Sequence, residues 1–149
     1  MSRARAMGAI DDDAGTMTGS LRRSRERASM NTALVVDDAA TERARMSAIL
    51  TDAGWRVSTA VGGIEAIEKA RAERPAIIFL DIVMPDLDGY QTCRRLAGDP
   101  LTRSIPVVFV STKCQRADQV WALMQGAKAL IGKPYSPAQL LDALKFAVQ

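Results

Sequence analysis

Apolar residues gather in four short continuous runs, and segments of mixed polarity separate them. The runs cover residues 33–36, 77–80, 107–110 and 130–131. Runs of this length without polar interruption are typical of strands in a parallel sheet that is buried on both faces. Residues 55–60 predict one further, weaker strand, because Val57 is apolar between polar neighbours.

Apolar residues at helical spacing predict three of the helices that connect these strands. A stripe in residues 44–53 stops at Gly54, and a stripe in residues 64–70 ends before Pro75. The fourth helix carries an apolar stripe that we expect to face the core: Val120, Leu123, Met124 and Ala127. Trp121 falls beside that stripe, so we expect it to be partly exposed.

Capping residues predict where the other two helices begin. Asp88 and Gln91 form a plausible capping box for a helix that runs through about Ala97. Ser136 and Gln139 repeat this pairing, with a proline at the first helical position. Five strands alternating with five helices predict a doubly wound α/β fold, and the flavodoxin-like strand order 2-1-3-4-5 is the natural fit.

Polar side chains follow four of the predicted strands at the point where each strand ends. They are Asp37 and Asp38 after the first strand, Asp81 after the third, Ser111 and Thr112 after the fourth, and Lys133 after the fifth. Because the carboxyl ends of parallel strands meet at one edge of the sheet, we expect these side chains to lie together. Carboxylates for a hard cation, an oxygen nucleophile and donors for an anion indicate a phosphoryl-transfer site.

These residues and their order resemble the receiver domain of two-component response regulators, from about Thr32 to the C-terminus. The resemblance implies that Asp81 accepts a phosphoryl group from a histidine kinase, and that Ser111 contacts a phosphoryl oxygen. It also implies that Lys133 pairs with the phosphorylated aspartate, aimed by a cis peptide bond to Pro134.

The same resemblance implies a Mg²⁺ site. Asp38 and Asp81 would bind the ion directly, Asp37 would act largely through water, and the carbonyl of Val83 would complete the protein ligands. Taken alone, the acidic pair Asp37–Asp38 could merely cap the first helix. Its position beside Asp81 and Lys133 favours the metal site.

Two positions depart from the family pattern, and a third position leaves a choice open. Leu130 stands where many receivers carry an aromatic residue coupled to the hydroxyl of the fourth strand, so the usual aromatic switch cannot operate. The side chain of Val83 offers no polar help to an attacking water. Of two adjacent hydroxyls, register favours Ser111 over Thr112.

Composition narrows the class of protein. The chain has 149 residues, of which 48% are hydrophobic and 25% charged, which fits one globular domain over residues 30–149. It has no His, and Cys93 and Cys114 lack metal-ligand spacing, which excludes the usual zinc sites and His-based triads. No apolar run approaches the ~20 residues of a membrane helix. We expect a cytoplasmic protein with reduced thiols and neither a membrane nor a nucleic-acid partner.

Residues 1–29 differ from the rest in being rich in Arg, Ala, Ser and Gly, and we expect them to be disordered. Arg22 and Arg23 are not followed by an apolar segment, which argues against a twin-arginine export signal. A basic tail that contacts nucleic acid or acidic lipid is one alternative. An artefact of start-codon choice is favoured over it, because Met30 lies three residues before the first strand.

No output domain follows the fifth helix, so we expect a receiver that acts alone, through a docking surface or as a phosphate sink. Residues 111–113, 118–121 and 125–127 resemble the single-domain regulators of type IV pilus (twitching) chemosensory systems. Regulators of the flagellar motor in chemotaxis share the same overall pattern of residues and remain an alternative. The resemblance implies a chemosensory histidine kinase as donor. It places a downstream protein on the face of the fourth helix, fifth strand and fifth helix, with Trp121 as a candidate contact.

Two other classes of protein fit the sequence less well than a receiver domain. A Mg²⁺-dependent aspartyl-phosphate phosphatase needs a second Asp where Val83 stands, so we do not expect an enzyme that acts on other substrates. A non-phosphorylated interaction module would not need Asp38, Asp81 and Lys133 intact.

Overall fold

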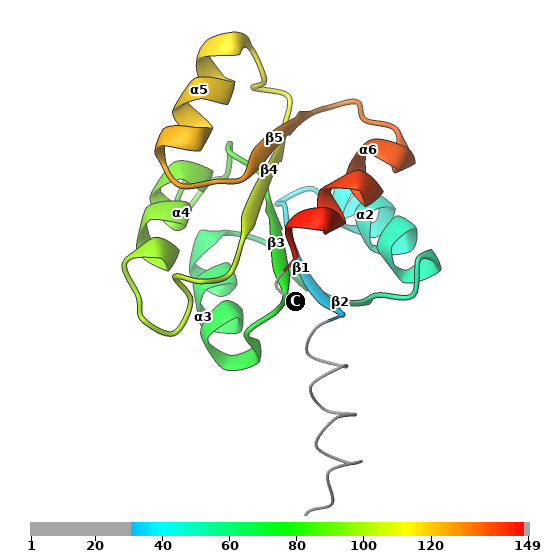
Figure 1. Ribbon diagram of the computed structural model, residues 1–149, viewed down its shortest axis with the longest axis horizontal. Coiled ribbons are helices and arrows are strands. Elements are labelled where there is room, and N and C mark those ends of the chain that lie inside the picture. Colours follow the sequence, from blue (N-terminus) through cyan, green and yellow to red (C-terminus); the bar gives the residue numbers. More distant parts are fainter. Residues whose placement is uncertain (1–30, 148–149) are drawn as a thin grey trace, which may run out of the picture.

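A five-stranded parallel sheet forms the centre of the computed structural model, which describes residues 31–147 (Figure 1). The strands are β1 (Thr32–Val36), β2 (Arg56–Ala60), β3 (Ile77–Leu80), β4 (Val107–Ser111) and β5 (Ala129–Gly132). Their order is β2-β1-β3-β4-β5, with every neighbouring pair parallel. The predicted strand order is therefore confirmed.

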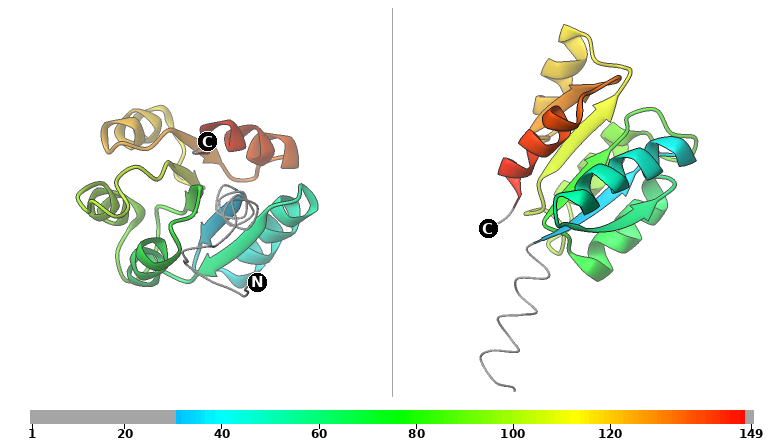
Figure 2. Two further views of the ribbon diagram at one scale, coloured as in Figure 1. Left: turned by 60° about the horizontal axis from the view of Figure 1, so that its bottom comes forward. Right: turned by 90° about the vertical axis from the view of Figure 1, so that its right-hand side faces the viewer.

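Helices cover both faces of this sheet (Figures 1 and 2). They are α2 (Ala40–Asp52), α3 (Gly63–Glu73), α4 (Gly89–Ala97), α5 (Arg116–Met124) and α6 (Pro137–Asp142), which continues as the 3₁₀ turn η1 (Ala143–Phe146). Side chains alternate along each strand, so one core joins Leu34 and Ile78 to α3, α4 and α5, and a second joins Val35 and Phe79 to α2 and α6.

Both predicted capping boxes are present. Asp88 accepts a hydrogen bond from the backbone N–H of Gln91 at 2.8 Å, and the Gln91 side chain accepts one from the Asp88 backbone at 3.1 Å. Ser136 and Gln139 make the same reciprocal pair at the start of α6. These local signals set the starts of α4 and α6, which explains why the sequence located both helices correctly.

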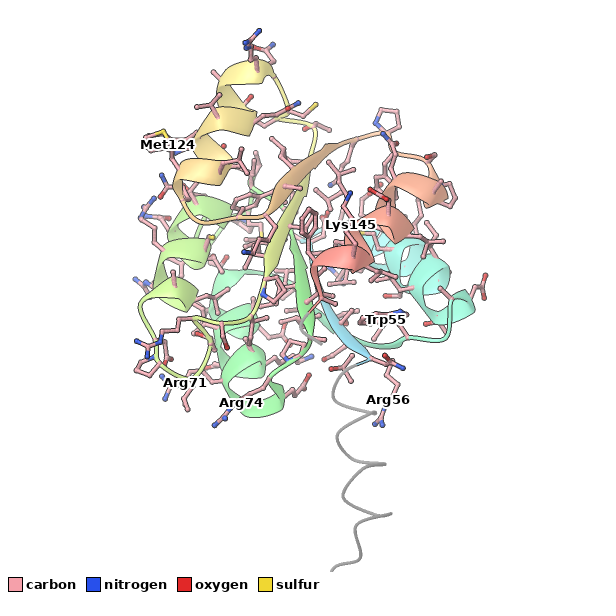
Figure 3. The ribbon with its side chains drawn as sticks, viewed as in Figure 1. Trp55, Arg56, Arg71, Arg74, Met124 and Lys145 are labelled. Carbon is pink, nitrogen blue, oxygen red and sulfur yellow. The ribbon has the colours of Figure 1, made fainter. Side chains whose placement is uncertain are left out.

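The predicted burial of the stripe on α5 is wrong. Val120, Leu123 and Met124 are 53%, 58% and 68% exposed, and of the four predicted residues only Ala127, just beyond the helix, is buried. Ala122, a small residue, faces the core instead. The reason is that α5 packs against β5, the edge strand of the sheet, so fewer neighbouring elements cover its surface. Figure 3 shows Met124 on the outer side of this helix.

Trp121 is partly exposed, as expected, with 44% of its surface accessible. Its ring lies edge-on to that of Tyr90, with centroids 6.3 Å apart, and Tyr90 in turn lies edge-on to the buried Phe109. The expectation of disorder for residues 1–29 lies outside the described residues. Within residues 31–147, no helix combines the length and the apolar character needed to span a membrane.

Candidate functional site

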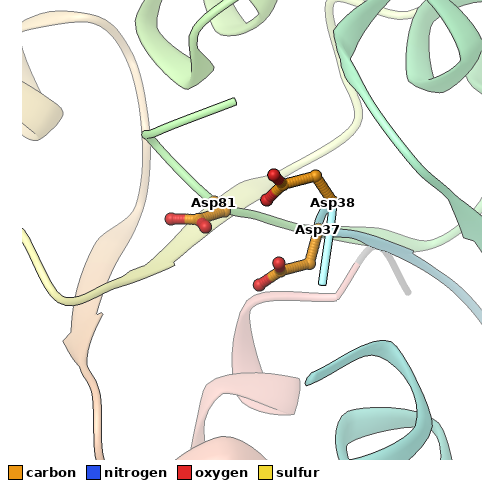
Figure 4. A group of neighbouring side chains, drawn as sticks. All are labelled: Asp37, Asp38 and Asp81. Carbon is orange, nitrogen blue, oxygen red and sulfur yellow. The ribbon is translucent and has the colours of Figure 1, made fainter. Parts of the chain in front are cut away.

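Strand register places the first group of charged side chains. Val36 and Leu80 are paired neighbours on β1 and β3, and the residues that follow them are Asp37 and Asp81. Together with Asp38, these residues offer carboxylate oxygens that lie within 4.8 Å of one another (Figure 4). The predicted acidic cluster therefore exists at the carboxyl edge of the sheet.

This cluster fits a hard divalent cation. Asp37 and Asp81 are 1% and 8% exposed, whereas Asp38 is open to solvent. One oxygen of Asp37 accepts a hydrogen bond from the N–H of Ala39, and one oxygen of Asp81 accepts one from the N–H of Ile82. The second oxygen of each buried carboxylate faces Lys133 Nζ, and Asp38 adds carboxylate oxygens on the solvent side of the cluster. Mg²⁺ prefers oxygen ligands of this kind and usually keeps several of its waters, for which the exposed side of the cluster leaves access.

Lys133 links two of the carboxylates. Its Nζ lies 2.7 Å from Asp37 Oδ2 and 3.4 Å from Asp81 Oδ2. Burial opposes the charge of this ammonium, but the hydrogen bond to Asp37 and the charges of Asp81, Asp37 and Glu42 outweigh burial and raise the pKa of Lys133. The peptide bond to Pro134 is cis. A single ammonium cannot neutralise three carboxylates, so the cluster retains a negative charge that favours a cation.

Ser111 ends β4 at the same edge of the sheet. Its side chain is fully buried, its Oγ accepts a hydrogen bond from the N–H of Lys113 at 3.1 Å, and it pairs in register with Gly132, directly before Lys133. Thr112 is exposed. The structure therefore gives the two hydroxyls different surroundings, with that of Ser111 enclosed at the strand end.

The loop after Asp81 carries the remaining predicted ligand, Val83. Its side chain is 61% exposed, in keeping with an expected contribution through the carbonyl alone. The loop is closed at its base, where Ile82 O accepts a hydrogen bond from the N–H of Gly89 at 2.7 Å. A Cβ at Gly89 would overlap the carbonyl oxygen of Asp81, so this close approach requires glycine.

Sequence reasoning missed two acidic residues at this edge. Glu42 Oε1 lies 4.0 Å from Lys133 Nζ and is buried without a hydrogen-bond partner among the described residues. Its position four residues after Asp38, in the first turn of α2, was the available signal. Asp86 hydrogen-bonds the backbone at the start of α3, a contact across 22 and 23 residues of sequence for which no local pattern exists.

Known proteins with similar sequences or structures align with most of this chain. Protein PilH of Pseudomonas aeruginosa is 40% identical over 111 residues, which are 74% of this chain and 92% of PilH. Among solved structures, the chemotaxis protein CheY4 of Vibrio cholerae superposes with a TM-score of 0.74 at 29% identity, covering 80% of this chain and 99% of CheY4.

A second solved structure with a similar fold contains a metal ion. The receiver domain of the sensor histidine kinase PA1611 of Pseudomonas aeruginosa, solved with a magnesium ion coordinated in its active-site cleft, matches with a TM-score of 0.72 at 27% identity. The match covers 77% of this chain and 94% of that domain. The family model described as the response regulator receiver domain matches residues 33–145. With the fold and the acidic edge both in place, we conclude that the chain belongs to the family of response regulator receiver domains.

Proposed function

We propose that this protein is a phosphoacceptor response regulator in which Asp81 receives a phosphoryl group from a histidine kinase. The observation that carries the proposal is the edge cluster, in which three carboxylates lie within 4.8 Å and Lys133 contacts two of them. Asp37, Asp38, Asp81 and the carbonyl of Val83 are the proposed Mg²⁺ ligands. The bound ion would supply the positive charge that lets an anionic donor approach this acidic edge.

The two oxygens of Asp81 have different surroundings, which suggests how the reaction proceeds. Oδ1 is held by the N–H of Ile82, while Oδ2 faces Lys133. Attack by a carboxylate oxygen on phosphorus forms the acyl phosphate and breaks the P–N bond of the donor phosphohistidine, whose electron pair returns to the imidazole. Lys133 and the hydroxyl of Ser111 then offer a charge and a hydrogen bond to the new phosphoryl oxygens.

Incubation with acetyl phosphate and Mg²⁺ tests this reaction directly. We expect intact mass spectrometry to show a gain of one phosphoryl group that requires Mg²⁺ and disappears in Asp81→Asn. Asp142→Asn, at an exposed carboxylate on α6, is the matched control and should be labelled like the wild type. Labelling that survives in Asp81→Asn would refute the assignment. Hydrolysis of a phosphomonoester such as p-nitrophenyl phosphate, which is not an acyl phosphate donor, would favour the phosphatase alternative.

We further propose that the protein serves type IV pilus chemosensory signalling, as its likeness to PilH suggests. Regulation of the flagellar motor is the alternative that its likeness to CheY4 keeps open. Phosphotransfer from the purified chemosensory kinases of the source organism, followed over the first minute, identifies the cognate system. Fastest transfer from a flagellar chemotaxis kinase would overturn the pilus assignment.

The proposed docking surface is the outer face of α5 with the neighbouring β5 and α6, and its occupant is a downstream protein. Four large apolar side chains are exposed on α5: Val120, Trp121, Leu123 and Met124. Contiguous exposed apolar groups are typical of protein contact sites, and tryptophan is enriched among the residues that dominate binding. These exposed side chains therefore support this face as the docking surface, although the sequence alone predicts burial for three of them.

A further inference from the structure

The first turn of α3 takes its cap from a distant part of the chain. Its N-cap residue is Gly62, which has no side chain to bind the free N–H groups of the first turn. Asp86 binds them instead: Oδ1 accepts from the N–H of Gly63 and Oδ2 from the N–H of Ile64, each at 3.0 Å. Those hydrogen bonds lower the pKa of the Asp86 carboxyl, with the bond from Ile64 contributing most.

Gly62 is needed for this contact. A Cβ at position 62 would lie 2.6 Å from Asp86 Oδ1, so any other side chain would push the carboxylate away. The backbone of Gly62 is extended, with φ −167°, a conformation that every residue can adopt. The glycine is therefore explained by the approach of Asp86, at a position where Ser, Thr, Asp or Asn would ordinarily cap the helix.

Asp86 belongs to the loop that follows Asp81 and precedes α4. The two ends of this loop are fixed by the hydrogen bond between Ile82 and Gly89 and by the capping box of Asp88. Between these ends lie Val83, which directly follows Ile82, and Asp86, which is bound to the start of α3. Asp86 therefore tethers the part of the loop that lies between the fixed ends.

We propose that Asp86 is a positioning residue, whose bridge to the start of α3 holds the loop so that the carbonyl of Val83 is presented to the metal. The inference rests on the proposed function in taking Mg²⁺ as the ligand. Partners that orient metal ligands typically change metal affinity by 10- to 100-fold when removed. The expected effect is at the lower end of that range, because one carbonyl among several oxygen ligands is affected.

Three variants separate the tether from the cap. Asp86→Ala removes both roles. Gly62→Ser combined with Asp86→Ala restores a local cap without restoring the tether, and the clash at position 62 is gone because the carboxylate is gone. Glu65→Ala is the matched control, because Glu65 accepts a hydrogen bond from Val61 N–H at the same helix end and belongs to α3 rather than to the loop.

The measurements are the melting temperature without Mg²⁺ and the Mg²⁺ dissociation constant from the Mg²⁺-dependent thermal shift. We expect Asp86→Ala to melt at a lower temperature and to bind Mg²⁺ about tenfold more weakly. We expect the double variant to recover the melting temperature but keep the weak Mg²⁺ binding. Glu65→Ala should melt at a lower temperature than the wild type and bind Mg²⁺ with wild-type affinity.

Three results would overturn the inference: unchanged affinity in Asp86→Ala, affinity restored by the local cap, or an equal loss of affinity in Glu65→Ala. A wild-type protein without any Mg²⁺-dependent shift would instead overturn the proposed metal site, and the inference would fall with it. The two kinds of failure are therefore distinguishable.

Discussion

Helices α4 and α5 have the same length and cover the same face of the sheet, yet they pack differently. Each has nine residues, but α4 buries four of them, including Cys93 and Leu96, and α5 buries only Ala122. The first large residue of α4, Tyr90, contacts Phe109 on an interior strand, whereas α5 packs against the edge strand β5. Helix position over the sheet, rather than apolar content, decides how much of each helix is buried.

The largest expected effect compares one substitution on the two helices. Leu96→Ala in α4 should lower the free energy of unfolding by about 2–5 kcal/mol, because Leu96 is buried and the change leaves a cavity. Leu123→Ala, the same chemical change on α5, should cost no more than about 0.5 kcal/mol at a site that is 58% exposed. Urea denaturation measures both. Equal costs would show that α5 is packed as tightly as α4.

The same contrast explains what the sequence could and could not predict. Continuous apolar runs located the buried strands, and the ends of parallel strands necessarily brought Asp37 and Asp81 together. The capping boxes at Asp88 and Ser136 each join residues three apart in sequence, so they could be predicted from the sequence alone. The stripe on α5 indicated a helix correctly but not its orientation, because burial depends on which strand lies beneath it. The bridge from Asp86 to the N–H groups of Gly63 and Ile64 joins a loop to a helix that is distant in sequence, so it leaves no periodic signal.

A second prediction uses the buried thiol of α4. Burial raises the pKa of Cys93 from 9.0 to about 11. The unfolded chain therefore loses this proton at a lower pH than the folded protein, and stability must fall as the pH rises from about 9 to about 11. At about 1.4 kcal/mol per pKa unit, the full loss of stability is about 3 kcal/mol.

Cys93→Ala provides the control for this effect. Other groups that titrate at high pH are shared by both proteins, so the difference between their pH dependences isolates the thiol. Denaturation at pH 8 and pH 11 should show a steeper decline for the wild type. Parallel declines would mean that the thiol is not shielded in the folded protein.

Trp121→Ala tests the contact between the two helices. Loss of the edge-on ring contact with Tyr90 should cost about 0.5–1.5 kcal/mol of stability. Phosphorylation by acetyl phosphate should be unchanged. Binding to the downstream protein should weaken by about thirtyfold or more, which corresponds to the loss of about 2 kcal/mol expected for a hot-spot residue. Leu101→Ala, at an exposed apolar residue outside α5, is the control for binding. A folded Trp121→Ala protein that binds its partner normally would remove this residue from the interface.

The smallest effect on stability is expected at Met124, which is 68% exposed at the end of α5. Met124→Lys should change the free energy of unfolding by no more than about 0.5 kcal/mol, because it removes little buried surface. It places a charge on the apolar face, however, and charged groups are depleted at the centres of protein interfaces. Ala72→Lys, at an exposed position on α3, adds the same charge elsewhere and serves as the matched control. Loss of partner binding in Met124→Lys alone, measured by titration calorimetry, would support the exposed face of α5 as the docking surface. Wild-type binding by both variants would mean that the apolar side chains of α5 are exposed for a reason other than partner binding.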